Sequence, residues 1–564
     1  MHQQSMASLY LSGLALSSGL SINGLTNVAI TSIEKRFELS SSQTALIPIM
    51  YEISSSVLII VIGYFFAHGN KPRWIASGGI IVTVGCFVFA LPHFLTGIYV
   101  YEGSGGNITN VMLCPNENNA TSCEANESIP EARSISRLSK YLYVFMVGQI
   151  LMGVGNAPAN ALQTVYLDES VKAKNIGIYL GIQGAVTNLA SAIGFIAGGI
   201  ILEVLFTDYI HVDTKTLGLS PSDPQWVGAW WLGFLFCAAG ALVFAIFISC
   251  FPPQMPGFEI YRKERQGQEQ KVTGLERASQ PGFGITFRDI PAATLVLFRN
   301  PLYLFIMFTN ISDISFLAGA EVFLPKFLEL QFALSAGDAA ITVGVIATVF
   351  GTIALLFGGW LIKKFDLKVR GMLKVCLGSN IACAFLLFTT FLRCPEIPLA
   401  GFSVPYDTGE YDTGEYQISN NLVDLEAQCN SYCNCSTTKF NPVCSSEGIT
   451  YFSACHAGCE VFDQQANQYS NCSCISVTPE ATNQTFPNSA VSGACGGSCV
   501  QFYIFAGCLS GLVFFYLLTG APRTNVLLRC VPHRLRSYAN ALNSLIVRSL
   551  GKFEQVYVIR IQHW

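Results

Sequence analysis

Four ionisable side chains lie within or near the ends of long apolar stretches, where a charge is costly and therefore points to function. They are Arg548, His93, Lys326 and Glu52. Arg548 lies in the apolar run 545–550, and its planar guanidinium could hold a carboxylate or a sulfate through two hydrogen bonds. The alternative is an arginine that only extends to a helix end. We favour anion binding because the residue lies well inside the stretch.

The other three side chains fit the same chemistry. An imidazole titrates near physiological pH, so His93 could couple anion uptake to external acidity, or it could be a hydrogen-bonding group of the packing. Lys326 could attract anions at an outer mouth, or only extend to the interface. Glu52 could partner a cation such as Arg548 and tune the charge of a path, or form a structural salt bridge.

No catalytic constellation accompanies these residues. The sequence contains no Gly-x-x-x-x-Gly-Lys-Ser/Thr motif, so an ATP-driven pump is not indicated. No loop expected on the inner side is large enough to be a catalytic domain. We therefore expect no enzymatic activity, cofactor, metal site or nucleic-acid partner.

The elements that position these residues are expected to cross a membrane. The 564 residues are 51% hydrophobic and only 12% charged, about half the charge of a soluble domain. A span needs about 20 mostly apolar residues. The stretches that qualify are approximately 7–30, 43–67, 75–95, 141–166, 175–205, 227–251, 301–329, 337–362, 375–393, 500–520 and 538–551, the last only in part.

Charge and cysteine divide the connections between two sides. Five connections hold 20 of the 32 Lys and Arg residues, so the positive-inside rule places them in the cytoplasm. These connections are 68–74, 167–174, 252–300, 363–374 and 521–537. The segment 394–499 holds 11 acidic residues, one Lys and 11 of the 20 Cys, so we expect it outside. Glycosylation sequons fall on that side too, at Asn107, Asn119, Asn126 and Asn483.

The expected fold class is an all-α polytopic membrane protein, similar to the major facilitator superfamily, with a small disulfide-rich extracellular module. Residues 7–251 form the amino-terminal half, 252–300 a cytoplasmic linker, and 301–393 with 500–551 an incomplete carboxy-terminal half. Short repeated features favour two parallel halves of six helices, of which 11 spans are found and the twelfth is missing.

Six cysteines of the outer loop have a distinctive spacing: Cys429, Cys433, Cys435, Cys444, Cys455 and Cys459. So small a segment needs disulfides to fold, and six cysteines allow 15 pairings. A zinc site is less consistent with an oxidising side. The pattern around Pro-Val-Cys444 and Thr-Tyr451 resembles a Kazal-type module over about 425–476. That resemblance implies the pairs Cys429–Cys459, Cys435–Cys455 and Cys444–Cys474. The module could inhibit a protease or, as we favour, cap the outer mouth.

A tryptophan cluster opens the sixth apolar stretch, as expected at a membrane boundary. The residues of this motif are Asp223, Trp226, Gly228, Ala229, Trp230, Trp231 and Gly233. Together with the Kazal-like loop between the ninth and tenth stretches, the motif resembles the organic-anion-transporting polypeptide (solute carrier organic anion transporter) family. The resemblance extends over about 7–551.

This resemblance implies sodium-independent transport of amphipathic organic anions such as bile salts, conjugated steroids, thyroid hormones and prostanoids. Transport would occur at the plasma membrane by rocking of two halves, in exchange for bicarbonate or another anion. It implies anion binding by Arg548, a pH-linked role for His93, and a family lysine at Lys326. It also implies a twelfth span, which the residues after Gly551 do not provide. The alternative is a truncated protein that regulates full-length partners or displays the Kazal-like module.

Overall fold

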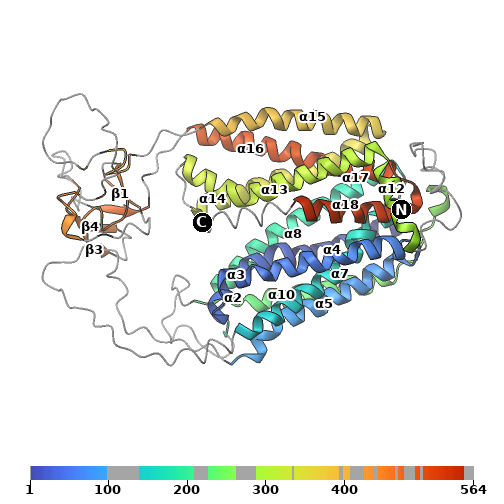
Figure 1. The fold of residues 1–564 in the computed structure, drawn as a ribbon, viewed down its shortest axis with the longest axis horizontal. Helices are drawn as coiled ribbons and strands as arrows, with labels where there is room; N and C mark the ends of the chain where they lie inside the picture. The colour runs from blue at the N-terminus through green and yellow to red at the C-terminus, as the bar shows by residue number, and fades with distance from the viewer. Residues whose placement is uncertain are drawn as a thin grey trace.

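The computed structural model describes residues 2–97, 139–208, 226–261, 287–332, 336–392 and 500–551, together with parts of 398–495. Long helices lie side by side in a bundle, and a small module of strands lies beyond one end (Figure 1). We call this end of the bundle the module end. The sequons Asn107, Asn119, Asn126 and Asn483 lie outside the described residues.

The amino-terminal half is built from six long helical segments. The first is continuous from α1 (His2–Gly19) through a π-helical turn (Leu20–Leu25) into α2 (Thr26–Phe37), so it extends beyond the expected end at residue 30 because the fully buried Phe37 anchors its last turn. After the short α3 (Ser41–Thr44), the others are α4 (Leu46–Phe65), α5 (Lys71–Leu95), α7 (Leu142–Ser170), α8 (Ile176–Val204) and α10 (Trp230–Ser249).

The carboxy-terminal half begins earlier than the sequence predicts. An apolar helix, α12 (Ile290–Phe298), lies within the expected linker and buries Ala293 and Leu297. The chain then bends by 85° into α13, where Asn300 accepts a hydrogen bond from the Leu302 amide at 3.1 Å and caps the new helix. The helices of this half after α12 are α13 (Pro301–Phe332), α14 (Ala336–Lys364), α15 (Val369–Leu387), α16 (Val500–Leu518), α17 (Gly520–Arg529) and α18 (Arg536–Gly551).

Within the described residues, nine helices are long and apolar enough to cross a membrane, or ten if the bent pair of α12 and α13 forms one span. The sequence predicts eleven. The difference is α18, whose 16 residues are fewer than a full span requires. The expected fold class, a polytopic bundle of helices with a small disulfide-rich module, is confirmed.

The helices pack as two similar halves. In the first half α7 packs on α4 and α5, and in the second half α16 packs on α14 and α15. The halves then meet through α8 against α14 and through α4 against α18. Glycine allows both contacts: a Cβ on Gly359 would lie 2.4 Å from the Gly177 carbonyl oxygen, and one on Gly63 would lie 2.4 Å from the Ala541 Cβ. These contacts lie near the end of the bundle opposite the module.

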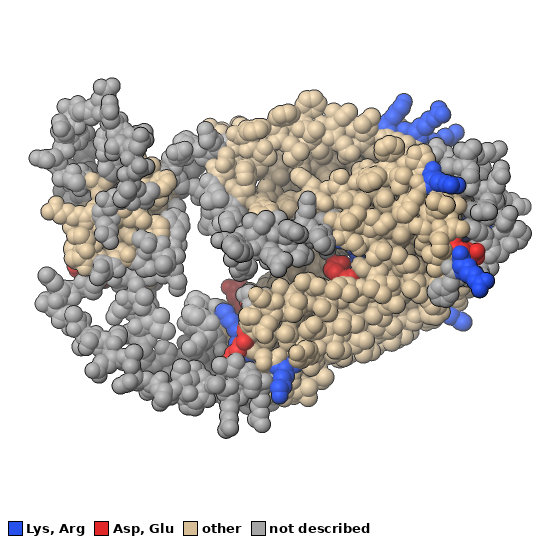
Figure 2. Space-filling view, viewed as in Figure 1, with Lys and Arg blue, Asp and Glu red and all other residues tan. Residues whose placement is uncertain are grey.

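The visible surface divides by charge. Lys and Arg side chains gather mainly on the end of the bundle opposite the module, whereas the long sides of the bundle carry few charges (Figure 2). A recess lies between the two halves on this face, with acidic atoms at its edge. An uncharged belt between polar ends is the surface that a bilayer requires.

The module contains a five-stranded sheet in the order β2-β1-β5-β4-β3. Its strands are β1 (Val443–Ser445), β2 (Thr450–Tyr451), β3 (Cys459–Asp463), β4 (Gln468–Cys472) and β5 (Ala490–Ser492). Leu399 adds a bridge to Thr450. The module is therefore larger than the expected 425–476, because residues before and after that range complete its sheet.

The disulfides differ from the expected Kazal-type set. Cys435 pairs with Cys455, as expected. The expected pairs Cys429–Cys459 and Cys444–Cys474 are wrong: the bonds join Cys429 to Cys474, Cys459 to Cys472, and Cys444 to Cys495.

The sheet explains the corrected pairing. Cys459 and Cys472 are opposite each other in the antiparallel register of β3 and β4, with Cα atoms 3.8 Å apart. Cys444 lies on β1, which pairs with β5, and Cys495 lies three residues after the end of β5. The pairing of β3 with β4 thus decides the partner of Cys459, and the pairing of β1 with β5, which lies beyond residue 476, decides the partner of Cys444.

Candidate functional site

Arg548 and Glu52 meet between the two halves. Arg548 belongs to α18 and Glu52 to α4, and the Nη1 atom of the arginine lies 3.5 Å from Oε2 of the glutamate. The same Nη1 donates to the Ser55 hydroxyl at 3.3 Å. The sequence predicted that Glu52 could partner this arginine, and the structure brings the two side chains together across 496 residues.

The pair remains accessible. The Arg548 side chain is 26% exposed and the Glu52 side chain 31%. One turn of α4 away from Ser55, the Tyr51 hydroxyl accepts a hydrogen bond from the Asn156 side chain of α7 at 2.8 Å. The site therefore has one cation, one carboxylate and several neutral polar groups. A second carboxylate or a sulfate could replace Glu52 on the guanidinium, because the fork offers donors for two oxygens.

Amide side chains add further polar contacts near the contacts between helices. Asn188 of α8 donates to the Thr352 hydroxyl of α14 at 3.1 Å, which links the two halves. Within the second half, Asn310 of α13 donates to Asn543 of α18 at 3.1 Å. Such groups hold helices in register within an apolar bundle.

His93 lies away from the Arg548 pair, in the tryptophan motif. Its ring stacks on Trp231 with centroids 4.4 Å apart and planes inclined by 11°. Trp230 is buried against Phe89 and Phe145. The structure therefore places His93 on α5 at the packing contact between α5 and α10, near the module end of the first half.

The tryptophan motif joins the start of α10 to the end of α8. The Trp226 indole donates to the Leu202 carbonyl at 2.7 Å, and the Trp231 indole donates to the Thr207 carbonyl at 3.1 Å. A Cβ on Gly228 would lie 2.3 Å from the Leu202 oxygen, so only glycine fits there. The motif thus fastens two helices together. Asp223 lies outside the described residues.

Close contacts with neighbouring helices explain the remaining motif residues. The Ala229 amide donates to the Leu205 carbonyl at 2.8 Å. A Cβ on Gly233 would lie 2.8 Å from the Leu25 side chain, so this glycine lets α10 approach the first span. Lys326 follows Pro325 within α13, and its side chain lies outside the described part of the structure.

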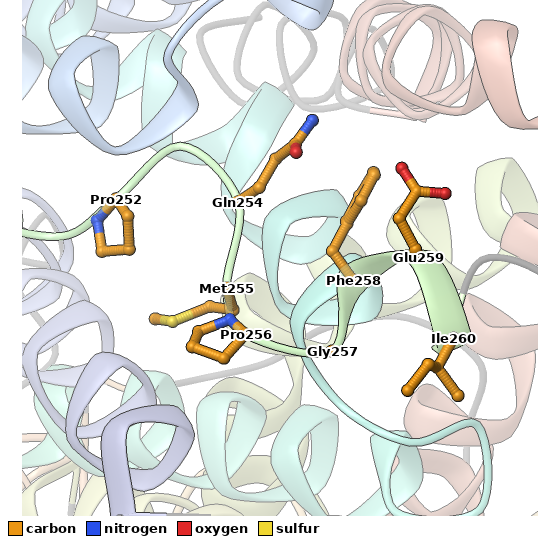
Figure 3. Close-up of a pocket in the computed structure, with 8 residues that line it drawn as sticks. All are labelled: Pro252, Gln254, Met255, Pro256, Gly257, Phe258, Glu259 and Ile260. Atoms are coloured by element: carbon orange, nitrogen blue, oxygen red, sulfur yellow. The ribbon is translucent and has the colours of Figure 1, made fainter.

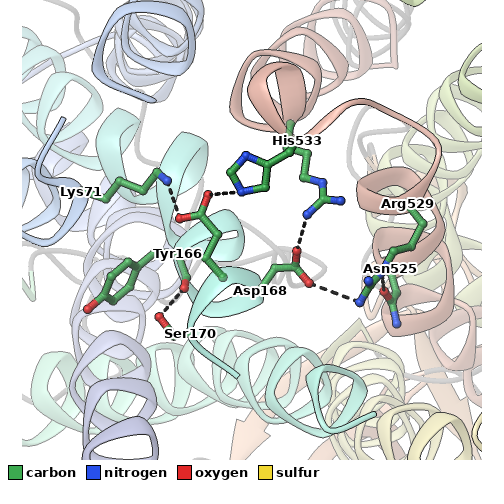
Figure 4. A network of polar contacts seen from close by, with 9 residues as sticks. Lys71, Tyr166, Asp168, Ser170, Asn525, Arg529 and His533 are labelled. Atoms are coloured by element: carbon green, nitrogen blue, oxygen red, sulfur yellow. Dashed lines mark hydrogen bonds and ion pairs between the residues drawn. The ribbon is translucent and has the colours of Figure 1, made fainter. Parts of the chain in front are cut away.

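A charge network that the sequence analysis missed connects the halves at the end opposite the module (Figure 4). Asp168 of α7 lies 3.1 Å from Arg536 and 3.5 Å from Arg529, both from the second half. The side chains of Asp168 and Arg536 are fully buried. Glu169 contacts Lys71 at 2.5 Å and His533 at 3.5 Å. One signal was available: acidic residues end span four, and basic residues end span ten.

This network closes one end of the space between the halves. Both arginines come from the second half, and both contact the carboxylate of one residue of the first half. Separating the halves at this end would break both contacts and expose the charges to water. Buried ion pairs hold surfaces together while they remain intact, and hydration replaces them when they open.

A surface pocket of about 600 Å³ lies elsewhere, after α10 (Figure 3). Its lining comes wholly from the single segment between Pro252 and Ile260. One local segment lines it, so it does not connect the two halves. Among the described residues, no group of three or more His, Cys, Asp and Glu side chains could hold a metal ion.

Two halves of membrane-crossing helices, with an accessible charge pair between them and an ionic closure at one end, define a membrane transporter. Residues 8–555 match the profile of the Organic Anion Transporter Polypeptide (OATP) family, so the chain belongs to this family.

Three relatives show the extent of the similarity. Solute carrier organic anion transporter family member 4C1 of Mus musculus is 35% identical over 545 residues, which cover 95% of this chain and 71% of the relative. Member 4A1 of Mus musculus is 34% identical, with 96% and 72% covered. Member 1C1 of Homo sapiens is 29% identical, with 94% and 76% covered.

Solved structures with a distant likeness include two transporters of the major facilitator superfamily. The proton:xylose symporter XylE, bound to 6-bromo-6-deoxy-D-glucose, aligns with a TM-score of 0.47 and 13% identity, over 98% of this chain and 88% of that one. FucP in the outward conformation aligns with a TM-score of 0.45 and 11% identity, over 97% and 98%.

Proposed function

We propose that this protein transports amphipathic organic anions across the plasma membrane, independently of sodium and by alternating access. Bile salts, conjugated steroids, thyroid hormones and prostanoids are the substrate class, and bicarbonate or another anion is exchanged. Membership of the family supports anion transport. Such ligands are mostly apolar with one negative group, so a path with few cations suits them.

The observation that carries the proposal is the contact between Arg548 and Glu52. Each residue comes from a different half, so the pair lies where a transported ligand must pass. When a carboxylate or sulfate arrives, it replaces Glu52 on the guanidinium, and the displaced Glu52 carboxylate, whose side chain is 31% exposed, is solvated by water. When the ligand leaves, Glu52 returns. The guanidinium is therefore never left without an anion in a low-dielectric environment, which would be costly.

The closure by Asp168 supports alternating access. With this end closed, a ligand reaches Arg548 from the module end. Rocking of the halves would then break the contacts of Asp168 and open the opposite end. The excess of Lys and Arg in the loops at that end supports a cytoplasmic position for it and an extracellular position for the module. Lys326 would attract anions, and protonation of His93 would couple uptake to external pH.

The test is uptake of a tritiated steroid sulfate by cells that express the full chain, normalised to the amount of protein at the surface. We expect sodium-independent, saturable uptake. Arg548→Ala should lower kcat/KM by about tenfold or more, since a hydrogen-bonded charge contact is lost. Arg548→Lys should retain part of the activity, because the charge remains without the fork.

Arg370→Gln is the matched control, because Arg370 is an exposed arginine in the first turn of α15. It should leave uptake unchanged. Absence of uptake by the surface-delivered wild-type chain would refute the transport proposal. Protease binding by the full chain, in the same preparation, would then favour display of the Kazal-like module.

A further inference from the structure

A second arginine–carboxylate pair lies within the carboxy-terminal half. Arg523, in the second turn of α17, is ion-paired through Nη1 with Oδ2 of Asp313, near the middle of α13. Each side chain keeps 19% of its surface exposed. The Tyr516 hydroxyl donates to the Asp313 carbonyl oxygen at 2.8 Å and fixes the backbone at this point.

The helices that carry this pair border the space between the halves. α17 packs against α8 of the first half, and α13 packs against α18, the helix that carries Arg548. Asn310, one turn before Asp313 on α13, bonds to Asn543 of α18. Charged side chains inside membrane spans face a polar interior or a water-filled cavity rather than lipid. The exposed part of Arg523 is therefore expected to face the path.

We infer that Arg523 is a second binding site for the anionic group of the ligand, with Asp313 as a built-in competitor. In the absence of ligand, Asp313 occupies the guanidinium. A carboxylate or sulfate that enters the path displaces Asp313, and Asp313 displaces it again during release. This inference rests on the proposed function, because it requires that organic anions pass between the halves.

A competing carboxylate predicts an outcome that a structural salt bridge does not. If the pair only supports the fold, Asp313→Asn leaves a buried arginine without a partner, so stability and uptake both fall. If Arg523 binds the ligand, Asp313→Asn removes the competitor and KM falls. The two explanations thus differ in the sign of the change.

The test measures the kinetics of tritiated steroid sulfate uptake by the full chain. We expect Asp313→Asn to lower KM by about tenfold and Arg523→Gln to raise it by about tenfold, as for loss of one charge-assisted contact. Arg370→Gln again serves as the control and should change nothing. An unchanged or raised KM in Asp313→Asn would overturn the inference.

A second measurement keeps this inference distinct from the proposed function. The purified full chain in nanodiscs is melted with and without the same steroid sulfate. A larger ligand-induced rise in Tm for Asp313→Asn than for the wild type supports the site even without uptake, whereas an equal or smaller rise overturns it. If Asp313→Asn does not fold, Arg523→Lys decides: a raised KM at an unchanged Tm supports the site, and an unchanged KM overturns it.

Discussion

Replacing Asp168 by Asn should open the end of the bundle opposite the module. Asp168 and Arg536 are fully buried, and Arg529 is 3% exposed, so both contacts of the carboxylate are shielded from water. The amide keeps the shape of the side chain but removes its charge. While the halves are together, the two buried arginines then lack the negative charge of Asp168. Once this end opens, water solvates them. The substitution therefore destabilises the closed state and not the open one.

The expected magnitude follows from the burial. Removing one partner of a buried ion pair costs about 3–5 kcal/mol. At about 1.4 kcal/mol per factor of ten, the lower figure changes the ratio of closed to open molecules by about 150-fold. A population that is about 99% closed would become about 40% closed. The open fraction would thus rise by tens of fold.

A cysteine at the contact between α4 and α18 can report this change. The Ser537 carbonyl oxygen lies 2.9 Å from the ideal Cβ position of Gly63, and Ser537 is 3% exposed. The purified Ser537→Cys protein is labelled with a maleimide, and the labelling of the new cysteine is followed by peptide mass spectrometry. Adding Asp168→Asn to this protein should make the labelling tens of fold faster. The exposed Cys250 provides an internal standard.

The matched control is Arg370→Gln, which removes the charge of an exposed arginine outside this network. It should change the labelling of Cys at position 537 by no more than about twofold. If Asp168→Asn folds and labels no faster than the wild type, the ion pairs do not hold this end closed, and the reasoning is refuted.

Three further predictions concern packing and the module. Gly359→Leu should lower Tm and abolish uptake, because the new side chain would clash with the Gly177 backbone. Gly344→Leu on the same helix is the control and should have little effect, because open space surrounds that position. Equal effects of the two substitutions would contradict the close contact of the halves. Cys444→Ser should cost the module about 4 kcal/mol by opening a 51-residue separation and so reduce surface delivery, measured by biotinylation; normal delivery would count against it. Trp231→Phe should cost about 1 kcal/mol through loss of the indole hydrogen bond, seen as a lower Tm than for Trp74→Phe at a more exposed site; equal Tm values would contradict it.

The sequence predicts the spans well because their signal is local. About 20 apolar residues in succession suffice, and α4, α5 and α8 lie close to their expected limits. α12 was missed because its nine residues are too few to qualify and follow a polar linker. Its burial depends on neighbours that are distant in sequence.

The candidate site was predictable only in part, for a related reason. Arg548 and Glu52 were identifiable because each interrupts an apolar run. Asp168 and Arg536 lie at span ends, where charges are common, and their pairing across 368 residues has no local trace. Cys459 was assigned the wrong partner because its bond to Cys472 depends on a strand register that spacing alone does not reveal.

The attachment of the module has a mechanical consequence. Cys495, bonded to β1 through Cys444, is five residues from the start of α16, and Leu399 of the sheet is seven residues beyond Leu392, which follows α15. Such tethers reach at most about 18 and 25 Å. Since α15 and α16 pack together in the second half, the module must travel with that half. A fluorophore on the module would therefore report the motion of the second half from outside the bundle. A binding protein that immobilised the module would slow that motion.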